Sequence, residues 1–184
     1  MQVGPDKDER DLIGKAKEGN RSAFSQLVRP HLPPLMVLAR RMLGSAEDAE
    51  DAVQTALAST WMARARLDPE QPIAPFLTTV TLNKCRDRIR RRKVARLVGL
   101  SDAIYAVSSD DPDQLRSAAG RELLTRTARA IERLPLKLRE ALVLVALDGR
   151  SQAEAAQLLG VTEKTIETRI YRARQKLREK LDFS

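Results

Sequence analysis

Residues 151–174 read SQAEAAQLLGVTEKTIETRIYRAR. Ser151 and Glu154 have the spacing of a capping box, which predicts that a helix starts there. Gly160 suits the left-handed residue that ends a helix, and Thr162 is a favourable N-cap for the helix that follows. The stretch therefore predicts a helix-turn-helix.

The second helix of this pair has two distinct faces. Its apolar residues recur at spacings of four, three and four, which predicts that they face a core: Ile166, Ile170, Ala173 and Leu177. The other face is polar and basic and carries Lys164, Thr165, Thr168, Arg169 and Arg172. Such a face is typical of a helix that enters the major groove of DNA. The alternative interpretation is a helical hairpin whose basic face is only solvated.

The composition favours helices and a polyanionic partner. The chain has 184 residues and a net charge of +8, with 42% hydrophobic and only 3% aromatic residues. A core with so few aromatics must be built from Leu, Val, Ile and Ala, which favours an all-α fold. The positive charge points to nucleic acid or an anionic membrane. Since no apolar run reaches the roughly 18 residues of a membrane span and no signal-peptide pattern is present, we expect a cytoplasmic protein without membrane insertion.

The distribution of charge predicts two domains. Residues 1–93 contain 17 Lys+Arg against 12 Asp+Glu, and residues 121–184 contain 14 against 9. Residues 94–120 contain 2 against 4 and include the turn-forming run SSDDPD at 108–113. We therefore predict helical domains at 1–93 and 121–184, joined by a flexible acidic linker at 94–120.

The N-terminal domain is predicted to contain a long helix that begins after Ser45 and runs to Trp61. Its acidic and amide residues near the start are Asp48, Glu50, Asp51 and Gln54. Acidic residues there also suit the helix dipole. A merely solvated acidic face therefore stays open as the alternative.

Residues 62–75 are predicted to form a loop, and residues 76–93 a strongly basic helix. Seven of the ten residues from 84 to 93 are basic, a density that binds phosphates with release of counterions. Asn83 is suited to hydrogen-bond a base edge. Asp87 lies one turn from Asn83 and from Arg91, close enough to orient both, although an i,i+4 ion pair is the alternative. The helix lacks the large apolar face of a membrane-surface helix.

The sequence lacks the residue combinations that catalytic and metal sites require. His31 is the only histidine and Cys85 the only cysteine, so neither a zinc site nor an internal disulfide is predicted. There is no P-loop and no Ser/His/Asp set. We therefore expect no enzyme, no cofactor, no metal and no small-molecule substrate.

These parts together resemble a group IV, or extracytoplasmic function (ECF), sigma factor of bacterial RNA polymerase, over nearly the whole chain. The N-terminal motifs are DAEDAVQ at 48–54, Trp61, DP at 68–69, FL at 76–77, Asn83 and DRIRR at 87–91. The C-terminal motifs are LP at 134–135, RE at 139–140 and RIYRAR at 169–174. The resemblance implies a sigma-2-like helical bundle followed by a sigma-4-like helix-turn-helix.

The resemblance also implies roles for these residues. Docking on the clamp helices of the polymerase core would use Asp48, Glu50, Asp51 and Gln54. Reading and opening the −10 element would use the loop 62–75 and Asn83, Arg86, Asp87, Arg88, Arg90 and Arg91. Reading the −35 element would use Lys164, Thr165, Thr168, Arg169 and Arg172. The expected partners are RNA polymerase core, promoter DNA and an inhibitory anti-sigma factor.

Two other functions stay open on the sequence. A stand-alone helix-turn-helix regulator would bind its operator without polymerase. A sigma-like decoy would titrate an anti-sigma partner and never initiate. Glu167 stands where the family often has a basic residue, which is expected to change promoter preference or affinity.

Overall fold

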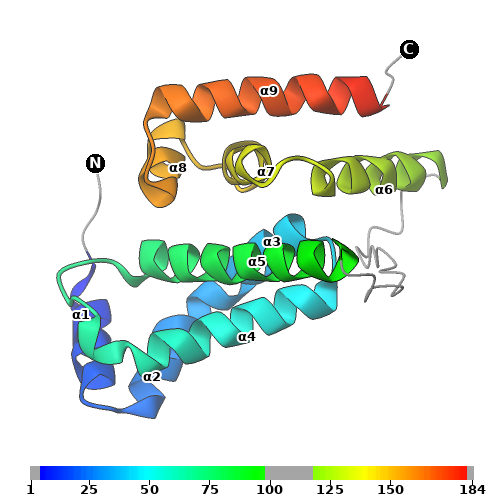
Figure 1. The fold of residues 1–184 in the computed structure, drawn as a ribbon. Helices are drawn as coiled ribbons and strands as arrows, with labels where there is room; N and C mark the ends of the chain where they lie inside the picture. The colour runs from blue at the N-terminus through cyan, green and yellow to red at the C-terminus, as the bar shows by residue number, and fades with distance from the viewer. Residues whose placement is uncertain (1–4, 98–117, 182–184) are drawn as a thin grey trace.

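The computed structural model describes residues 5–97 and 118–181, and every regular element in these two ranges is helical (Figure 1). The predicted all-α fold is confirmed for this part of the chain. Most of the predicted acidic linker, residues 98–117, lies outside the described residues.

Five helices form the N-terminal part. They are α1 (Lys7–Lys17), α2 (Arg21–Val28), α3 (Leu32–Leu43), α4 (Ala46–Met62) and α5 (Ile73–Leu97). Helices α3, α4 and α5 pack against one another, and α1 packs on α2. The largest side chains that are fully buried between them are Ile13, Leu38, Met42, Leu43, Leu77 and Leu82.

The prolines at 30, 33 and 34 lie where α2 ends and α3 begins. A 3-10 turn at Arg29–His31 separates the two helices, and α3 starts at Leu32 with Pro33 and Pro34 in its first turn. Proline is tolerated there because the first N–H groups of a helix have no intrahelical acceptor. Gly44 then ends α3 in the left-handed conformation, with φ at 72°.

The predicted boundaries of the basic helix are wrong at both ends. Helix α5 begins at Ile73 and runs to Leu97, whereas residues 76 and 93 were expected. Pro75 lies in the first turn, where it costs no hydrogen bond, so it does not exclude the residues before it from the helix. The loop before α5 is correspondingly shorter and includes a 3-10 turn at Arg64–Arg66.

The C-terminal part contains α6 (Ala118–Glu132), α7 (Leu136–Leu142), a π-helical turn (Val143–Leu147), α8 (Gln152–Leu159) and α9 (Glu163–Leu181). Helix α9 packs on α6, α7 and α8. Its apolar residues Ile166, Ile170 and Ala173 are buried, as their spacing predicts.

The caps of the helix-turn-helix are those the sequence predicts. Ser151 and Glu154 form both bonds of a capping box. Gly160 ends α8 with φ at 63°, in the left-handed region. The Thr162 hydroxyl accepts from the Thr165 N–H at 3.2 Å and caps α9. These local bonds fix the turn and therefore the direction in which α9 leaves it.

The two parts pack face to face, with α5 lying between α4 and the C-terminal helices (Figure 1). Arg139 of α7 donates to the Met42 carbonyl at 2.9 Å. Arg150, before α8, donates to the Thr78 hydroxyl of α5 at 3.3 Å. We call this the closed arrangement.

Candidate nucleic-acid interface

Helix α9 presents its predicted DNA-reading residues to solvent. Lys164, Thr168 and Arg172 are exposed, and Thr165 and Arg169 are half-buried beside them. The cap fixes the start of this helix, and its apolar face is buried against the other helices. The orientation of its exposed face is therefore set by the fold. This geometry suits entry into a major groove.

The side chains on this face differ in how far they are already engaged. The Lys164 ammonium lies 2.8 Å from the Glu167 carboxylate, and the Thr168 hydroxyl donates to the Lys164 carbonyl at 2.8 Å. No described residue forms a hydrogen bond or ion pair with the side chains of Arg169 and Arg172. Those two guanidinium groups are therefore the ones most available to phosphates or base edges.

The predicted DNA-reading residues of α5 are more engaged. Asn83, Asp87, Arg90 and Arg91 are exposed, but the Asn83 side-chain oxygen accepts from Arg86 at 2.6 Å. Asp87 lies 3.9 Å from Arg90. The suggested pairing of Asp87 with Asn83 and Arg91 is therefore not the one formed, because both observed pairs join residues three apart on the helix, where side chains also meet.

Arg86 also meets a residue from the other part of the chain. Its guanidinium forms an ion pair with Glu140 of α7, which is only 4% exposed. One predicted contact to the −10 element is thus occupied by the C-terminal helices in the closed arrangement. Next to it, burial raises the pKa of the Cys85 thiol to about 12, so this cysteine stays protonated and acts as a core residue.

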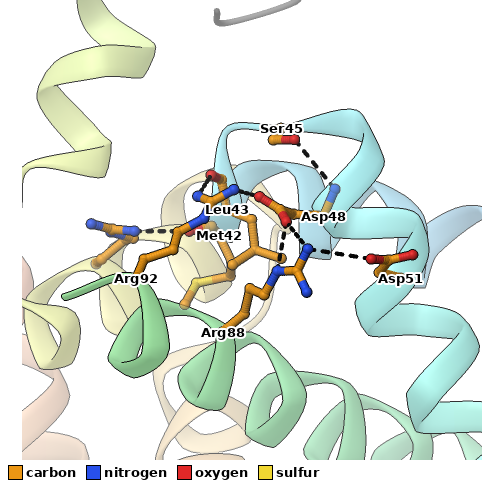
Figure 2. A network of polar contacts seen from close by, with 8 residues as sticks. Met42, Leu43, Ser45, Asp48, Asp51, Arg88 and Arg92 are labelled. Atoms are coloured by element: carbon orange, nitrogen blue, oxygen red, sulfur yellow. Dashed lines mark hydrogen bonds and ion pairs between the residues drawn. The ribbon is translucent and has the colours of Figure 1, made fainter. Parts of the chain in front are cut away.

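Arg88 points from α5 toward α4, as Figure 2 shows. Its Nε donates to the Asp48 carboxylate at 2.6 Å, and its Nη2 reaches the Asp51 carboxylate at 3.3 Å. The structure thus brings a residue predicted to contact DNA together with two residues predicted to contact polymerase.

Asp48 lies inside the structure and is only 2% exposed. Besides Arg88 it forms an ion pair with Arg92, and its N–H donates to the Ser45 hydroxyl at 3.2 Å (Figure 2). By contrast Glu50, Asp51 and Gln54 are exposed. The predicted polymerase-docking set therefore divides into one internal carboxylate and three surface residues.

A half-buried acidic group, Glu132, lies at the junction of the two parts. Burial raises the pKa of Glu132, against the opposing effect of Arg139 and Arg92. Burial lowers the pKa of Arg139, which Glu132 opposes. The Glu132 side chain lies directly over Gly44, where any Cβ would overlap it. A Cβ at position 44 would therefore require the Glu132 side chain to shift, and the left-handed backbone there favours glycine.

Sequence reasoning missed Arg92, Glu132 and Glu140 as functional candidates. Arg92 is one of seven basic residues among the ten from 84 to 93, and no local pattern indicates that its side chain points inward. Glu132 and Glu140 meet residues that are distant along the chain. Only the motif RE at 139–140 hinted at a constrained position, and it could not indicate the partner.

Two kinds of site do not occur in the described residues. No group of three or more His, Cys, Asp or Glu there could hold a metal ion. No helix among these residues is both long enough and apolar enough to cross a bilayer.

Both parts of the chain match known families. Residues 27–94 match Sigma-70 region 2, and residues 124–177 match Sigma-70, region 4. The RNA polymerase sigma factor CnrH of Cupriavidus metallidurans is 37% identical over 98% of this chain and 97% of CnrH. The ECF RNA polymerase sigma factor SigM of Mycobacterium tuberculosis is 34% identical over 97% of this chain and 87% of SigM.

Two solved structures are similar across the two parts. CnrH in complex with the cytosolic domain of CnrY has a TM-score of 0.67 and 35% identity, over 96% of this chain and 98% of that one. The sigma factor RpoE in complex with the anti-sigma factor NepR, from Bartonella quintana, has a TM-score of 0.67 and 29% identity, over 88% and 98%.

Proposed function

Because this chain belongs to the ECF group of the sigma-70 family, we infer that it directs RNA polymerase to specific promoters and starts transcription there. It contributes binding rather than catalysis. Contacts to the duplex place the polymerase, and contacts that form only with the opened strand favour melting, since a ligand shifts an equilibrium by its differential affinity for the two states.

Helix α9 reads the −35 element in this proposal. The observation that carries it is the exposed polar and basic face of a helix capped at its start and buried along its other side. Arg169 and Arg172 are suited to bidentate contacts with guanine or to phosphate contacts. Lys164 has to exchange Glu167 for DNA, which weakens its contribution.

Helix α5 reads the −10 element and holds the opened strand. Asn83 offers an amide for a base edge, and Arg90 and Arg91 offer exposed charge for phosphates. Arg86 joins them once it leaves Glu140. A base that has left the stack has to be held by such edge and backbone contacts.

The closed arrangement has to open for both elements to be read at once. Their centres are about 25 base pairs apart, or roughly 85 Å of B-DNA. In the closed arrangement α5 contacts α7 through Arg86 and Glu140, and it contacts the turn before α8 through Thr78 and Arg150. Polymerase and DNA together therefore select an extended arrangement over the closed one.

Docking on the polymerase core uses the exposed side of α4. Glu50, Asp51 and Gln54 point outward there, and Gln54 donates to Glu50 at 3.1 Å. Acidic and amide groups in one row suit a basic surface on the clamp helices of the largest subunit. Asp48 is buried and is not part of this exposed row.

An anti-sigma factor is the expected inhibitor. The relative RpoE was solved with the anti-sigma factor NepR, and CnrH with the cytosolic domain of CnrY. The closed arrangement offers a pocket of about 350 Å³ between α5 and α8, lined by Pro75, Phe76, Thr79, Arg150, Glu154, Gln157 and Leu158. Phe76 is 38% exposed there, which suits an apolar side chain of an inhibitor that holds the two parts together.

In vitro transcription from a pool of promoter fragments tests the proposal. Core polymerase with this protein should yield transcripts that share two spaced upstream elements, and core polymerase alone should not. Tight operator binding without polymerase would instead identify a stand-alone regulator. No transcript and no binding to core polymerase would identify a decoy.

A further inference from the structure

We propose that Asp48, Arg88 and Arg92 are positioning residues, an internal brace that sets the −10 helix α5 against the polymerase-docking helix α4. The positioning role rests on the proposed function. It takes Asp48 out of the polymerase contact and Arg88 out of the DNA contact, and it adds Arg92.

Asp48 is buried between helices. The Asp48 carboxylate is 2% exposed, so a partner surface cannot reach it in this structure. It meets two guanidinium groups, those of Arg88 and Arg92. A buried charge is tolerated when such partners compensate it, and here both partners come from a single helix.

Arg88 and Arg92 both point from α5 toward α3 and α4. Arg88 and Arg92 are four residues apart, so they share one face of α5. Arg86 and Arg90 each lie two residues from Arg88, and residues at that spacing do not face the same way. Arg88 therefore cannot join Asn83, Arg86 and Arg90 on one DNA surface while it holds Asp48.

The brace joins three elements at one point (Figure 2). Arg92 donates to the Leu43 carbonyl at the end of α3 at 3.1 Å. Ser45 caps α4 through the Asp48 N–H, which fixes the first turn that carries the carboxylate. The last carbonyl of α3, the first turn of α4 and the C-terminal half of α5 are thus held by one set of charges.

Arg88 also connects the brace to the surface. The same guanidinium that holds Asp48 reaches the exposed Asp51, with Nη2 and Oδ2 at 3.3 Å. Asp51 belongs to the proposed polymerase-docking row. A planar fork can serve two carboxylates at once, whereas a lysine ammonium is a single point charge. A polymerase group that binds Asp51 would therefore act directly on Arg88, the residue that positions α5.

The salt dependence of promoter binding separates a brace from a DNA contact. Each phosphate contact contributes about 0.9 to the slope of log K against log salt. For polymerase carrying Arg88→Ala we expect the wild-type slope, while the exposed control Arg90→Ala should lower its magnitude by about 0.9. A slope lowered equally by both variants would overturn the assignment of Arg88.

The rate of promoter opening, measured per bound complex, separates positioning from mere stability. Unfolded protein reduces the number of complexes but leaves the opening rate of those that form unchanged. We expect Arg88→Lys, which keeps the charge and loses the fork, to slow opening of the bound −10 element. A wild-type opening rate for this variant would overturn the positioning role.

Thermal unfolding of the isolated protein tests the brace without polymerase. We expect Asp48→Asn and Arg88→Gln each to lower Tm, and the double variant to lose less than the sum of the two losses, because the residues act as a pair. Additive losses would overturn the brace. If wild-type protein forms no promoter complex, the proposed function fails and the positioning role fails with it, whereas non-additive losses would still establish the internal pair.

Discussion

Helices α5 and α9 are both rich in basic residues, and both are proposed to touch promoter DNA, yet their charges are used differently. On α9, Arg169 and Arg172 have no partner among the described residues. On α5, Arg86 holds Glu140, while Arg88 and Arg92 hold Asp48. The two arginines of α9 remain available to a ligand, whereas three arginines of α5 form ion pairs that hold the molecule together.

The difference shows that a count of basic residues does not identify a DNA surface. A cation that faces a buried carboxylate contributes to the fold, and only exposed, unpaired cations remain to displace counterions from DNA. Substitutions in the two helices should therefore have different effects. Those at the paired arginines of α5 should mainly change stability and the arrangement of the two parts, and those on the exposed face of α9 should mainly change promoter binding.

The largest expected effect is on the brace. Asp48→Ala leaves Arg88 and Arg92 without their buried partner and should destabilise the protein by about 3–5 kcal/mol. Urea unfolding measures the change. The matched control is Asp51→Ala on the same helix, whose carboxylate is exposed and should cost at most about 1 kcal/mol. Equal losses for the two variants would remove the distinction between inner and outer carboxylates.

Glu140→Gln should loosen the closed arrangement. The variant weakens a charge-assisted bond to Arg86, which we estimate at about 1.5–3 kcal/mol, and it returns Arg86 to solvent. Energy transfer between dyes on α4 and α9 should fall, and the control Glu167→Gln on the open face of α9 should leave it unchanged. An unaltered transfer efficiency in Glu140→Gln would show that this pair does not hold the two parts together.

Arg172→Ala should weaken −35 recognition while leaving the fold intact. Loss of a base or phosphate contact is worth about 1–3 kcal/mol, and an exposed substitution away from the core should change stability by no more than about 0.5 kcal/mol. Binding of the polymerase complex to promoter fragments with intact and scrambled −35 elements measures the first. The opposite result, lost stability with normal promoter selection, would reverse the contrast with α5.

Ser151→Ala tests the turn that orients α9. Loss of the capping hydroxyl should cost about 1 kcal/mol, and the Glu154 carboxylate, whose pKa the Ser151 N–H and hydroxyl lower, should return toward its ordinary pKa. Since that bond favours the ionised form, its contribution is present above the ordinary pKa and is lost as pH falls. Chemical unfolding near neutral pH and at low pH checks both statements.

Glu132→Gln addresses the smallest effect, a pH dependence. Burial raises the pKa of Glu132 above its ordinary value of 4.5, so above that pH the native state binds more protons at this site than the unfolded state. The stability from this group is full below pH 4.5 and is lost as pH rises through the native pKa. The difference in unfolding midpoint between variant and wild type should therefore grow with pH. A constant difference would contradict the assignment.

The sequence predicts α9 better than α5 for a physical reason. The caps at Ser151, Gly160 and Thr162 and the buried stripe from Ile166 are set by residues within one or two turns, so spacing alone reveals them. Arg88 points inward because it binds Asp48, which lies forty residues earlier in the chain. Arg86 is engaged because it binds Glu140, which lies fifty-four residues later. No local period encodes these pairs, and the sequence accordingly predicts one undivided basic face.

Directed DNA cleavage would locate α5 and α9 on promoter DNA. Cys85 is the only cysteine, so Cys85→Ser gives a background in which Arg172→Cys or Arg90→Cys can carry a cleavage reagent. In complexes of promoter and RNA polymerase we expect cleavage near −35 from position 172 and near −10 from position 90, about 25 base pairs apart, or roughly 85 Å. Cleavage by both probes at one place, or the same cleavage without polymerase, would contradict the proposed roles of the two helices.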